Sequence, residues 1–184
     1  GSYNAAISAC EKAAQWCLAL VLLARMRTLR LDPDIVTYSA AISTCEKAVQ
    51  WQLALGLLAE MPSVSLSPNT VSYNAAISAC EKAARWQEAL GLLAEMPTVG
   101  LEPDTVSCNA AISTCEKGRQ WQLALGLLAA MPTLLLKPDT VSYNAAISAC
   151  EKAGRWRLAL TLLAEMPNVR VHPNTVSYSA AISA

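Results

Sequence analysis

The stretch Val71-Ser72-Tyr73-Asn74-Ala75-Ala76-Ile77-Ser78-Ala79-Cys80-Glu81-Lys82 decides the fold, because it recurs along the whole chain. Three close copies and two partial ones are present. The close copies begin at Val36, Val106 and Val141, and the partial ones cover 2–12 and 176–184. Successive copies are 35 residues apart, and a strict period of this size filled by helical patterns is typical of a solenoid. We therefore expect a repeat protein.

Steps of 35 residues divide the 184-residue chain into five full repeats and the start of a sixth. The predicted bounds are 1–34, 35–69, 70–104, 105–139 and 140–174, with a partial sixth repeat at 175–184. Because each unit buries its apolar faces against its neighbours, we expect residues 1–184 to form a single array.

The first half of the third repeat predicts a helix. Asn69 is well placed to cap it, since asparagine accepts hydrogen bonds from free backbone N–H groups at a helix start. Tyr73, Ile77 and Cys80 fall at i, i+4 and i+7, which places them on one apolar face of a helix over 71–83.

The second half of the repeat predicts another helix, over 86–96, whose apolar residues fall on two faces. Pro97 is expected to end it, because proline cannot continue the hydrogen-bond ladder. Residues 98–103 then form a short loop, and Asp104 begins the next unit. Antiparallel helix pairs repeated in this way predict an all-α fold, a right-handed α-solenoid.

Composition excludes several classes of protein. Lys and Arg number 14, as do Asp and Glu, so the formal net charge is zero and the chain is no simple polycation. A Glu-Lys pair and a proline interrupt every full repeat, which leaves no apolar window of membrane-spanning length. Nucleic-acid binding, where present, must therefore depend on where charges are placed.

Five of the seven cysteines lie one repeat apart. They are Cys10, Cys45, Cys80, Cys115 and Cys150. Stacked helices are roughly 8–10 Å apart, beyond the Cα separation of about 7 Å that a disulfide tolerates, so we expect reduced, buried thiols. No Cys-x-x-Cys motif, nucleophile–base set or phosphate loop is present, and we predict no metal, no cofactor and no catalysis.

These motifs resemble those of the pentatricopeptide repeat family. The resemblance rests on the 35-residue period, the stretch 71–82, Ala-Leu-Gly-Leu-Leu-Ala-Glu-Met at 89–96 and Glu-Pro-Asp-Thr-Val at 102–106, and it covers essentially the whole chain. A tetratricopeptide array has a 34-residue period and a different Trp/Gly/Tyr pattern. The chain departs from the family pattern in the tryptophan that opens each second helix, the cysteine ladder and the Met-Pro step.

The resemblance implies binding of single-stranded RNA, with one nucleotide read per repeat by two or three side chains. The implied base-reading pairs are Asn4 with Asp34, Ser39 with Asn69, Asn74 with Asp104, Asn109 with Asp139, and Asn144 with Asn174. By resemblance, Asn with Asp favours uridine, Ser with Asn favours adenine, and Asn with Asn favours a pyrimidine. With the family's parallel polarity, the implied target is 5′-U-A-U-U-Y-3′.

Helical geometry supports a shared binding stripe. Val71, Asn74, Ser78 and Lys82 are spaced 3, 4 and 4 residues apart, so they lie on one side of the first helix, offset from its packing face. The valines of this stripe are expected to sandwich bases, and the lysines to meet phosphates. The valines are Val36, Val71, Val106, Val141 and Val176, and the lysines are Lys12, Lys47, Lys82, Lys117 and Lys152.

Each feature also has a simpler interpretation. The Asp and Asn residues after the loop prolines are good helix N-caps, a role compatible with base reading. Each lysine follows a glutamate, and together they are compatible with a solvated, self-neutralised face. The tryptophans lie on the second helices, where packing between helices is favoured over base stacking.

The sequence therefore predicts an RNA-binding module of the organellar RNA processing, stability or translation type, located in a mitochondrion or plastid by family resemblance alone. Its expected partner is single-stranded RNA, joined by other proteins of a ribonucleoprotein assembly, and it is not expected to be membrane-embedded. The alternative is a protein-interaction scaffold within a larger assembly, which the extended surface and zero net charge allow.

Overall fold

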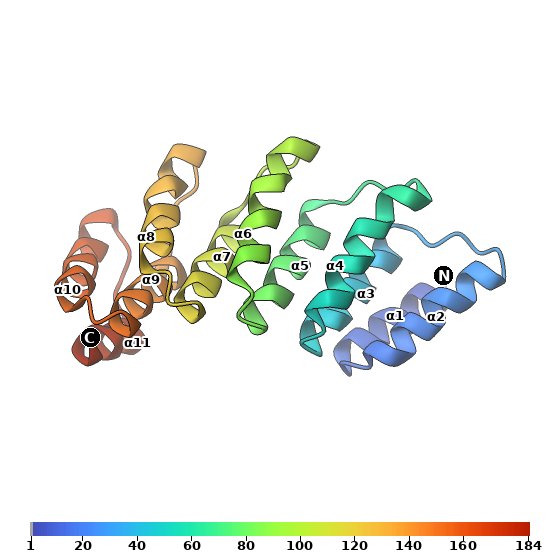
Figure 1. The fold of residues 1–184 in the computed structure, drawn as a ribbon, viewed down its shortest axis with the longest axis horizontal. Helices are drawn as coiled ribbons and strands as arrows, with labels where there is room; N and C mark the ends of the chain where they lie inside the picture. The colour runs from blue at the N-terminus through green and yellow to red at the C-terminus, as the bar shows by residue number, and fades with distance from the viewer. Residues whose placement is uncertain (1) are drawn as a thin grey trace.

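The computed structural model describes residues 2–184, which form eleven α-helices and four 3-10 helices stacked along one axis (Figure 1). The first helices of the repeats are α1 (Ser2–Lys12), α3 (Ile35–Lys47), α5 (Thr70–Lys82), α7 (Thr105–Lys117), α9 (Thr140–Lys152) and α11 (Thr175–Ser183). The second helices are α2 (Trp16–Thr28), α4 (Trp51–Glu60), α6 (Trp86–Glu95), α8 (Trp121–Ala130) and α10 (Trp156–Glu165).

The first helices begin where the cap residues predict. In the third repeat α5 starts one residue before the predicted position and ends one residue early. Asn69 caps it, and Ser72 completes the reciprocal capping box. Ile77 and Cys80 are fully buried and Tyr73 nearly so, which confirms the predicted packing face.

The end of the second helix differs from the prediction. Residues 98–103 were expected to form a loop after Pro97, but the chain continues from α6 into a 3-10 helix, η2 (Met96–Val99). Proline fits there because the first turn of a helix leaves its N–H groups without intrahelical partners. The same turn recurs as η1 (Met61–Val64), η3 (Met131–Leu134) and η4 (Met166–Val169).

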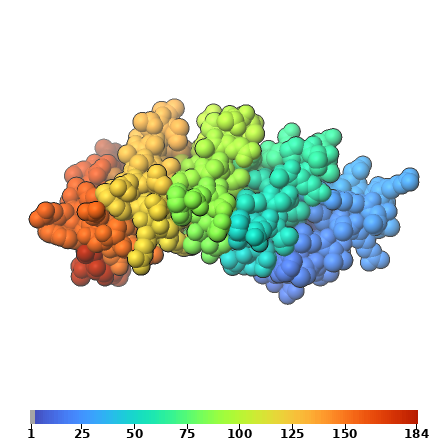
Figure 2. All heavy atoms as spheres, viewed as in Figure 1, coloured from blue at the N-terminus to red at the C-terminus, as the bar shows by residue number. Residues whose placement is uncertain are grey.

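The two sets of helices form different layers of the solenoid. Neighbouring first helices pack directly against one another, from α1 through to α11. Each second helix packs against its own first helix and the first helix of the next repeat. The colour bands of Figure 2 follow one another along the long axis, as expected of an α-solenoid in which each repeat touches its neighbours.

Apolar side chains between the layers form one continuous core. All seven cysteines are free thiols and six are buried, with Cys17 exposed. Burial raises the pKa of Cys45, Cys80 and Cys115 to about 11, so these thiols stay protonated at neutral pH. Within residues 2–184, no helix is both long enough and apolar enough to span a bilayer.

Three tryptophans, Trp16, Trp51 and Trp121, pack half-buried against this core, as their place on the second helices predicts, whereas Trp156 is exposed. Arginines of the following repeats cover two of them. The guanidinium of Arg85 lies 4.6 Å from the ring centroid of Trp51, and that of Arg155 lies 4.9 Å from Trp121. These cation–π contacts join second helices across repeat boundaries.

Candidate nucleic-acid interface

A row of exposed valines follows the first helices. The exposed fractions of their side chains lie within a narrow range, from 56% at Val176 to 60% at Val71. The other members of the row are Val36, Val106 and Val141. Such uniform exposure of an apolar side chain in every repeat leaves a periodic set of surfaces on which flat, apolar faces of a ligand can rest.

Beside this row, four of the five predicted base-reading pairs are joined by a hydrogen bond from one first helix to the N-cap of the next first helix. The Nδ2 of the first-helix asparagine donates to the acidic or amide side chain of that N-cap residue. The distances are 3.0 Å for Asn4 to Asp34, 3.1 Å for Asn74 to both carboxylate oxygens of Asp104, 3.1 Å for Asn109 to Asp139, and 3.2 Å for Asn144 to Asn174.

The second member of every pair is also a helix N-cap. Asp34, Asn69, Asp104, Asp139 and Asn174 each accept a hydrogen bond from the backbone N–H of the N3 residue, at 2.8–3.1 Å. Capping therefore holds each of these side chains in one rotamer at the edge of the valine row.

Capping also shifts the ionisation of two of these carboxyl groups. The backbone N–H of Thr37 holds the pKa of Asp34 below its ordinary value, against a smaller opposing effect of desolvation. For Asp139 the largest single effect is desolvation, which raises the pKa, but hydrogen bonds from Ser142, Asn109 and the Val141 backbone together outweigh it, so the pKa of Asp139 is lowered as well.

The pair formed by Ser39 and Asn69 is different, because no hydrogen bond joins the two side chains. The Oγ of Ser39 is buried and has no hydrogen-bond partner. Ser39 lines a recess of about 360 Å³, together with Asn69, Val36 and Val71. Two valines of the row and both members of the pair therefore surround one open space.

Residues beyond the predicted set also line this recess. Ser8, Glu11 and Ser43 contribute polar groups to it. Ser8 and Ser43 occupy the repeat position of Ser78, which the helical spacing had placed on the stripe, whereas nothing in the spacing pointed to Glu11. In the third repeat, the Oδ1 of Asn74 is a second buried polar atom of the stripe that has no partner.

The predicted phosphate lysines form a ladder of ion pairs. Each of four lysines contacts the glutamate of the preceding repeat, rather than the adjacent glutamate in the sequence. The pairs are Lys47 with Glu11 at 2.9 Å, Lys82 with Glu46 at 2.7 Å, Lys117 with Glu81 at 2.9 Å, and Lys152 with Glu116 at 2.7 Å. Lys12 is exposed and has no ion pair among residues 2–184.

Solved structures share this architecture. The chain matches pentatricopeptide repeat protein PPR10, from maize, in complex with an 18-nucleotide psaJ RNA element, with 25% identity and a TM-score of 0.82, over 98% of this chain and 26% of PPR10. It also matches the PPR domain of Arabidopsis thaliana protein-only RNase P 1 in complex with tRNA, with 14% identity and a TM-score of 0.80, over 94% of this chain and 91% of that domain. A third match is nuclear proteinaceous RNase P 2 of A. thaliana, with 13% identity and a TM-score of 0.82, over 97% of this chain and 40% of that protein.

The chain thus spans about a quarter of the length of PPR10. A comparison with curated proteins found no match. Family models match residues 2–117 and 138–184: the PPR repeat family at 33–80, 68–117 and 138–184, and the pentatricopeptide repeat domain at 2–48. Together with the period and the solenoid, these matches show that the chain belongs to the pentatricopeptide repeat family.

Proposed function

We propose that this chain binds single-stranded RNA, one base per repeat, with the preference 5′-U-A-U-U-Y-3′. The observation that carries the proposal is the hydrogen bond, of 3.0–3.2 Å, that joins each of four predicted pairs between neighbouring first helices, beside an evenly exposed valine row. The module acts by occupancy, protecting or remodelling a short site, and by family resemblance it does so in an organelle.

The hydrogen-bonding groups of the Asn–Asp pair in the third repeat suit uracil. In the third repeat the Nδ2 of Asn74 is partly committed to Asp104, while the Oδ1 of Asn74 is buried and lacks a donor. The N3–H of uracil supplies such a donor, and the remaining N–H of the amide faces a neighbouring carbonyl of the base. Buried polar groups left unpaired by a wrong base then penalise that base.

The second repeat suits a larger base. Ser39 is shorter than asparagine, and the recess in front of it is lined on two sides by valines. A hydroxyl both donates and accepts, and the amide of Asn69 keeps its Nδ2 free of other side chains in the structure, so the site complements the N1 acceptor and the N6 amine of adenine. Burying the base faces against Val36 and Val71 adds apolar contact.

Phosphates are proposed to meet the lysine ladder. Binding at all five lysines predicts a slope of about −3.5 in log affinity against log salt, from about 0.7 per contact on a single strand. Phosphates must compete with the glutamates that already contact four of these lysines, which lowers the net gain per contact.

The test is binding of a fluorescent single-stranded RNA containing UAUUC, at two salt concentrations, against a strand in which A and U are exchanged. We expect tighter binding of UAUUC and an affinity that falls as salt rises. Equal affinity for the two strands would contradict base reading, and absence of binding to either strand at low salt would contradict the RNA function itself.

A further inference from the structure

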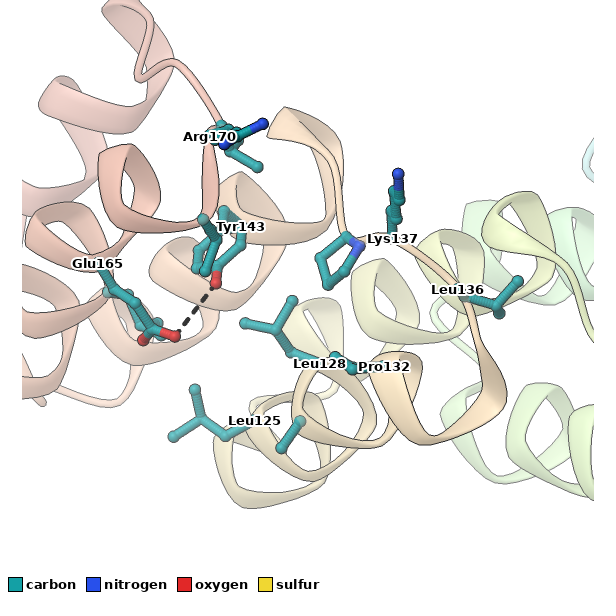
Figure 3. Close-up of a pocket in the computed structure, with 13 residues that line it drawn as sticks. Leu125, Leu128, Pro132, Leu136, Lys137, Tyr143, Glu165 and Arg170 are labelled. Atoms are coloured by element: carbon teal, nitrogen blue, oxygen red, sulfur yellow. Dashed lines mark hydrogen bonds between the residues drawn. The ribbon is translucent and has the colours of Figure 1, made fainter.

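One apolar cavity in the structure lies away from the valine row. It measures about 860 Å³ and opens between α8 and α10, with the turns that follow them (Figure 3). Leu125, Leu128 and Leu162 form much of its apolar wall, and the last two are almost fully buried. The size falls in the range of roughly 300–1,000 Å³ typical of ligand pockets. The splayed second helices leave this space on the opposite layer from the proposed RNA stripe.

Two features make this repeat boundary different from the others. Val171 lines the pocket where the equivalent residue of every earlier repeat is a leucine, so one methylene is missing from the wall. The equivalents are Leu31, Leu66, Leu101 and Leu136. Leu135, which is adjacent in sequence to the lining residue Leu136, is 93% exposed. Its equivalents Arg30, Ser65, Gly100 and Arg170 share its left-handed backbone, so the exposed apolar side chain is what distinguishes Leu135.

An exposed leucine with a left-handed backbone lowers the stability of the fold for two reasons. The left-handed region disfavours residues with a Cβ, and the side chain leaves apolar surface in water. Beside a pocket lined by leucines and valines, Leu135 extends the apolar surface outside the cavity. Such a combination marks a contact surface rather than a scattered surface leucine.

The charges around the pocket are also particular to this boundary. Lys137 and Arg170 both line it, and Figure 3 shows them toward one end, with Leu125 toward the other. Their equivalents at the preceding boundary are Glu102 and Leu135, and no earlier boundary carries two cations at these positions. The carboxylate of Glu165 lies elsewhere on the wall and accepts a hydrogen bond of 3.3 Å from the Tyr143 hydroxyl.

We propose that this pocket, together with Leu135, binds an acidic peptide segment of a partner protein, which inserts an apolar side chain between α8 and α10. The segment's carboxylates meet Lys137 and Arg170, and the negative charge of Glu165 sets its direction. A peptide fits better than an anionic membrane, because surface recognition of lipid headgroups uses clusters of four to eight cations. The proposal is independent of RNA binding, since no residue of the valine row lines the pocket.

The experiment is a selection of random 12-residue peptides displayed on phage against the folded chain, followed by anisotropy measurements on the enriched peptides. We expect leucine-like or aromatic residues flanked by Asp or Glu. Lys137→Glu combined with Arg170→Leu installs the pair found at the preceding boundary, and it should weaken binding at least tenfold. Val171→Leu, which restores the leucine of the other repeats, should weaken it severalfold.

The matched control is Ser67→Glu with Gly56→Ala, two changes at exposed residues of the second repeat that do not line the pocket, which should leave peptide affinity unchanged. A UAUUC-containing RNA should bind all variants equally and should not displace the peptide. Enrichment of basic or uncharged peptides, failure of any peptide to enrich, or binding insensitive to the pocket variants would overturn the proposal. Flotation with phosphatidylglycerol vesicles that depends on Lys137 and Arg170 would overturn it in favour of a lipid surface.

Discussion

The second base-reading site, Ser39 with Asn69, and the third, Asn74 with Asp104, both lie at a helix start with a capping box. Their side chains are arranged differently in the absence of a ligand. In the third site, Asn74 donates to both carboxylate oxygens of Asp104 at 3.1 Å. In the second, Ser39 has no partner and faces an open recess. The capping distances are nearly equal, 2.9 Å to Asn69 and 2.8 Å to Asp104.

The difference shows that capping fixes the position of the Asp or Asn in each pair. The first-helix residue then determines which hydrogen-bonding groups and how much space the site presents to a base. An asparagine reaches the N-cap of the next first helix and forms a hydrogen bond that closes the pair, while a serine is too short and leaves space. On our proposal, a closed pair selects a small base by its hydrogen bonds, and an open pair admits a purine.

The largest expected effect comes from making the second site identical to the third. Ser39→Asn with Asn69→Asp should move the preferred base at the second position from adenine to uracil. A good set of base-edge hydrogen bonds discriminates by about 1–3 kcal/mol, so UUUUC should overtake UAUUC by about tenfold or more in anisotropy titrations.

The reciprocal pair of changes supplies the control. Asn74→Ser with Asp104→Asn should convert the third site, so that UAAUC becomes preferred over UAUUC. Should either double variant bind both strands as the parent does, the assignment of base reading to these pairs would be wrong.

A smaller effect concerns stability without RNA. Asn74→Ala removes the hydrogen bonds to Asp104 and should lower the free energy of unfolding by about 1 kcal/mol. Ser39→Ala removes a buried hydroxyl that has no partner and should leave stability unchanged or slightly raised. Urea unfolding of the two variants measures this difference, and an equal loss in both would show that the second pair is also closed in solution.

The ion pair between Lys82 and Glu46 links the two sites and allows a third test. The Nζ of Lys82 and the Oε1 of Glu46 are 2.7 Å apart, and both side chains are partly exposed. Such a pair contributes about 0–1 kcal/mol to stability. Glu46→Gln frees the lysine and should tighten RNA binding a fewfold. Lys82→Gln should weaken it and reduce the salt slope by about 0.7. If neither change alters the slope of log affinity against log salt, Lys82 does not bind a phosphate.

Much of the fold could be predicted from the sequence because every signal is repeated. The cap at Asn69 and the apolar spacing after it located α5 to within one residue at each end. Proline misled the prediction after α6, since the same residue that stops an α-helix also suits the first turn of a 3-10 helix.

The site was only partly predictable for a geometric reason. The stripe and the reading pairs follow from spacing along one helix and from family resemblance. The ladder partner of Lys82 could not be found in this way, because its glutamate lies in the preceding repeat and becomes a neighbour through stacking. The space between α8 and α10 likewise depends on how far the second helices splay, which no local pattern specifies.

The smallest expected effect is a pH dependence that separates the first cap from the second. The folded-state pKa of Asp34 lies below its ordinary value of 3.8, chiefly because of the Thr37 backbone N–H. The ionised carboxylate therefore contributes stability above about pH 4, and this contribution is lost as pH falls through the folded-state pKa. Asn69 makes the same capping bond and does not titrate.

Asp34→Asn should therefore slightly flatten the acid side of the curve of stability against pH, while Asn69→Asp should steepen it. The measurement is the urea midpoint of unfolding between about pH 2 and pH 6. Identical curves for both variants and the parent would mean that the caps stabilise the helices by hydrogen bonding and not by charge. The choice between Asp and Asn at these positions would then concern the bound base rather than the fold.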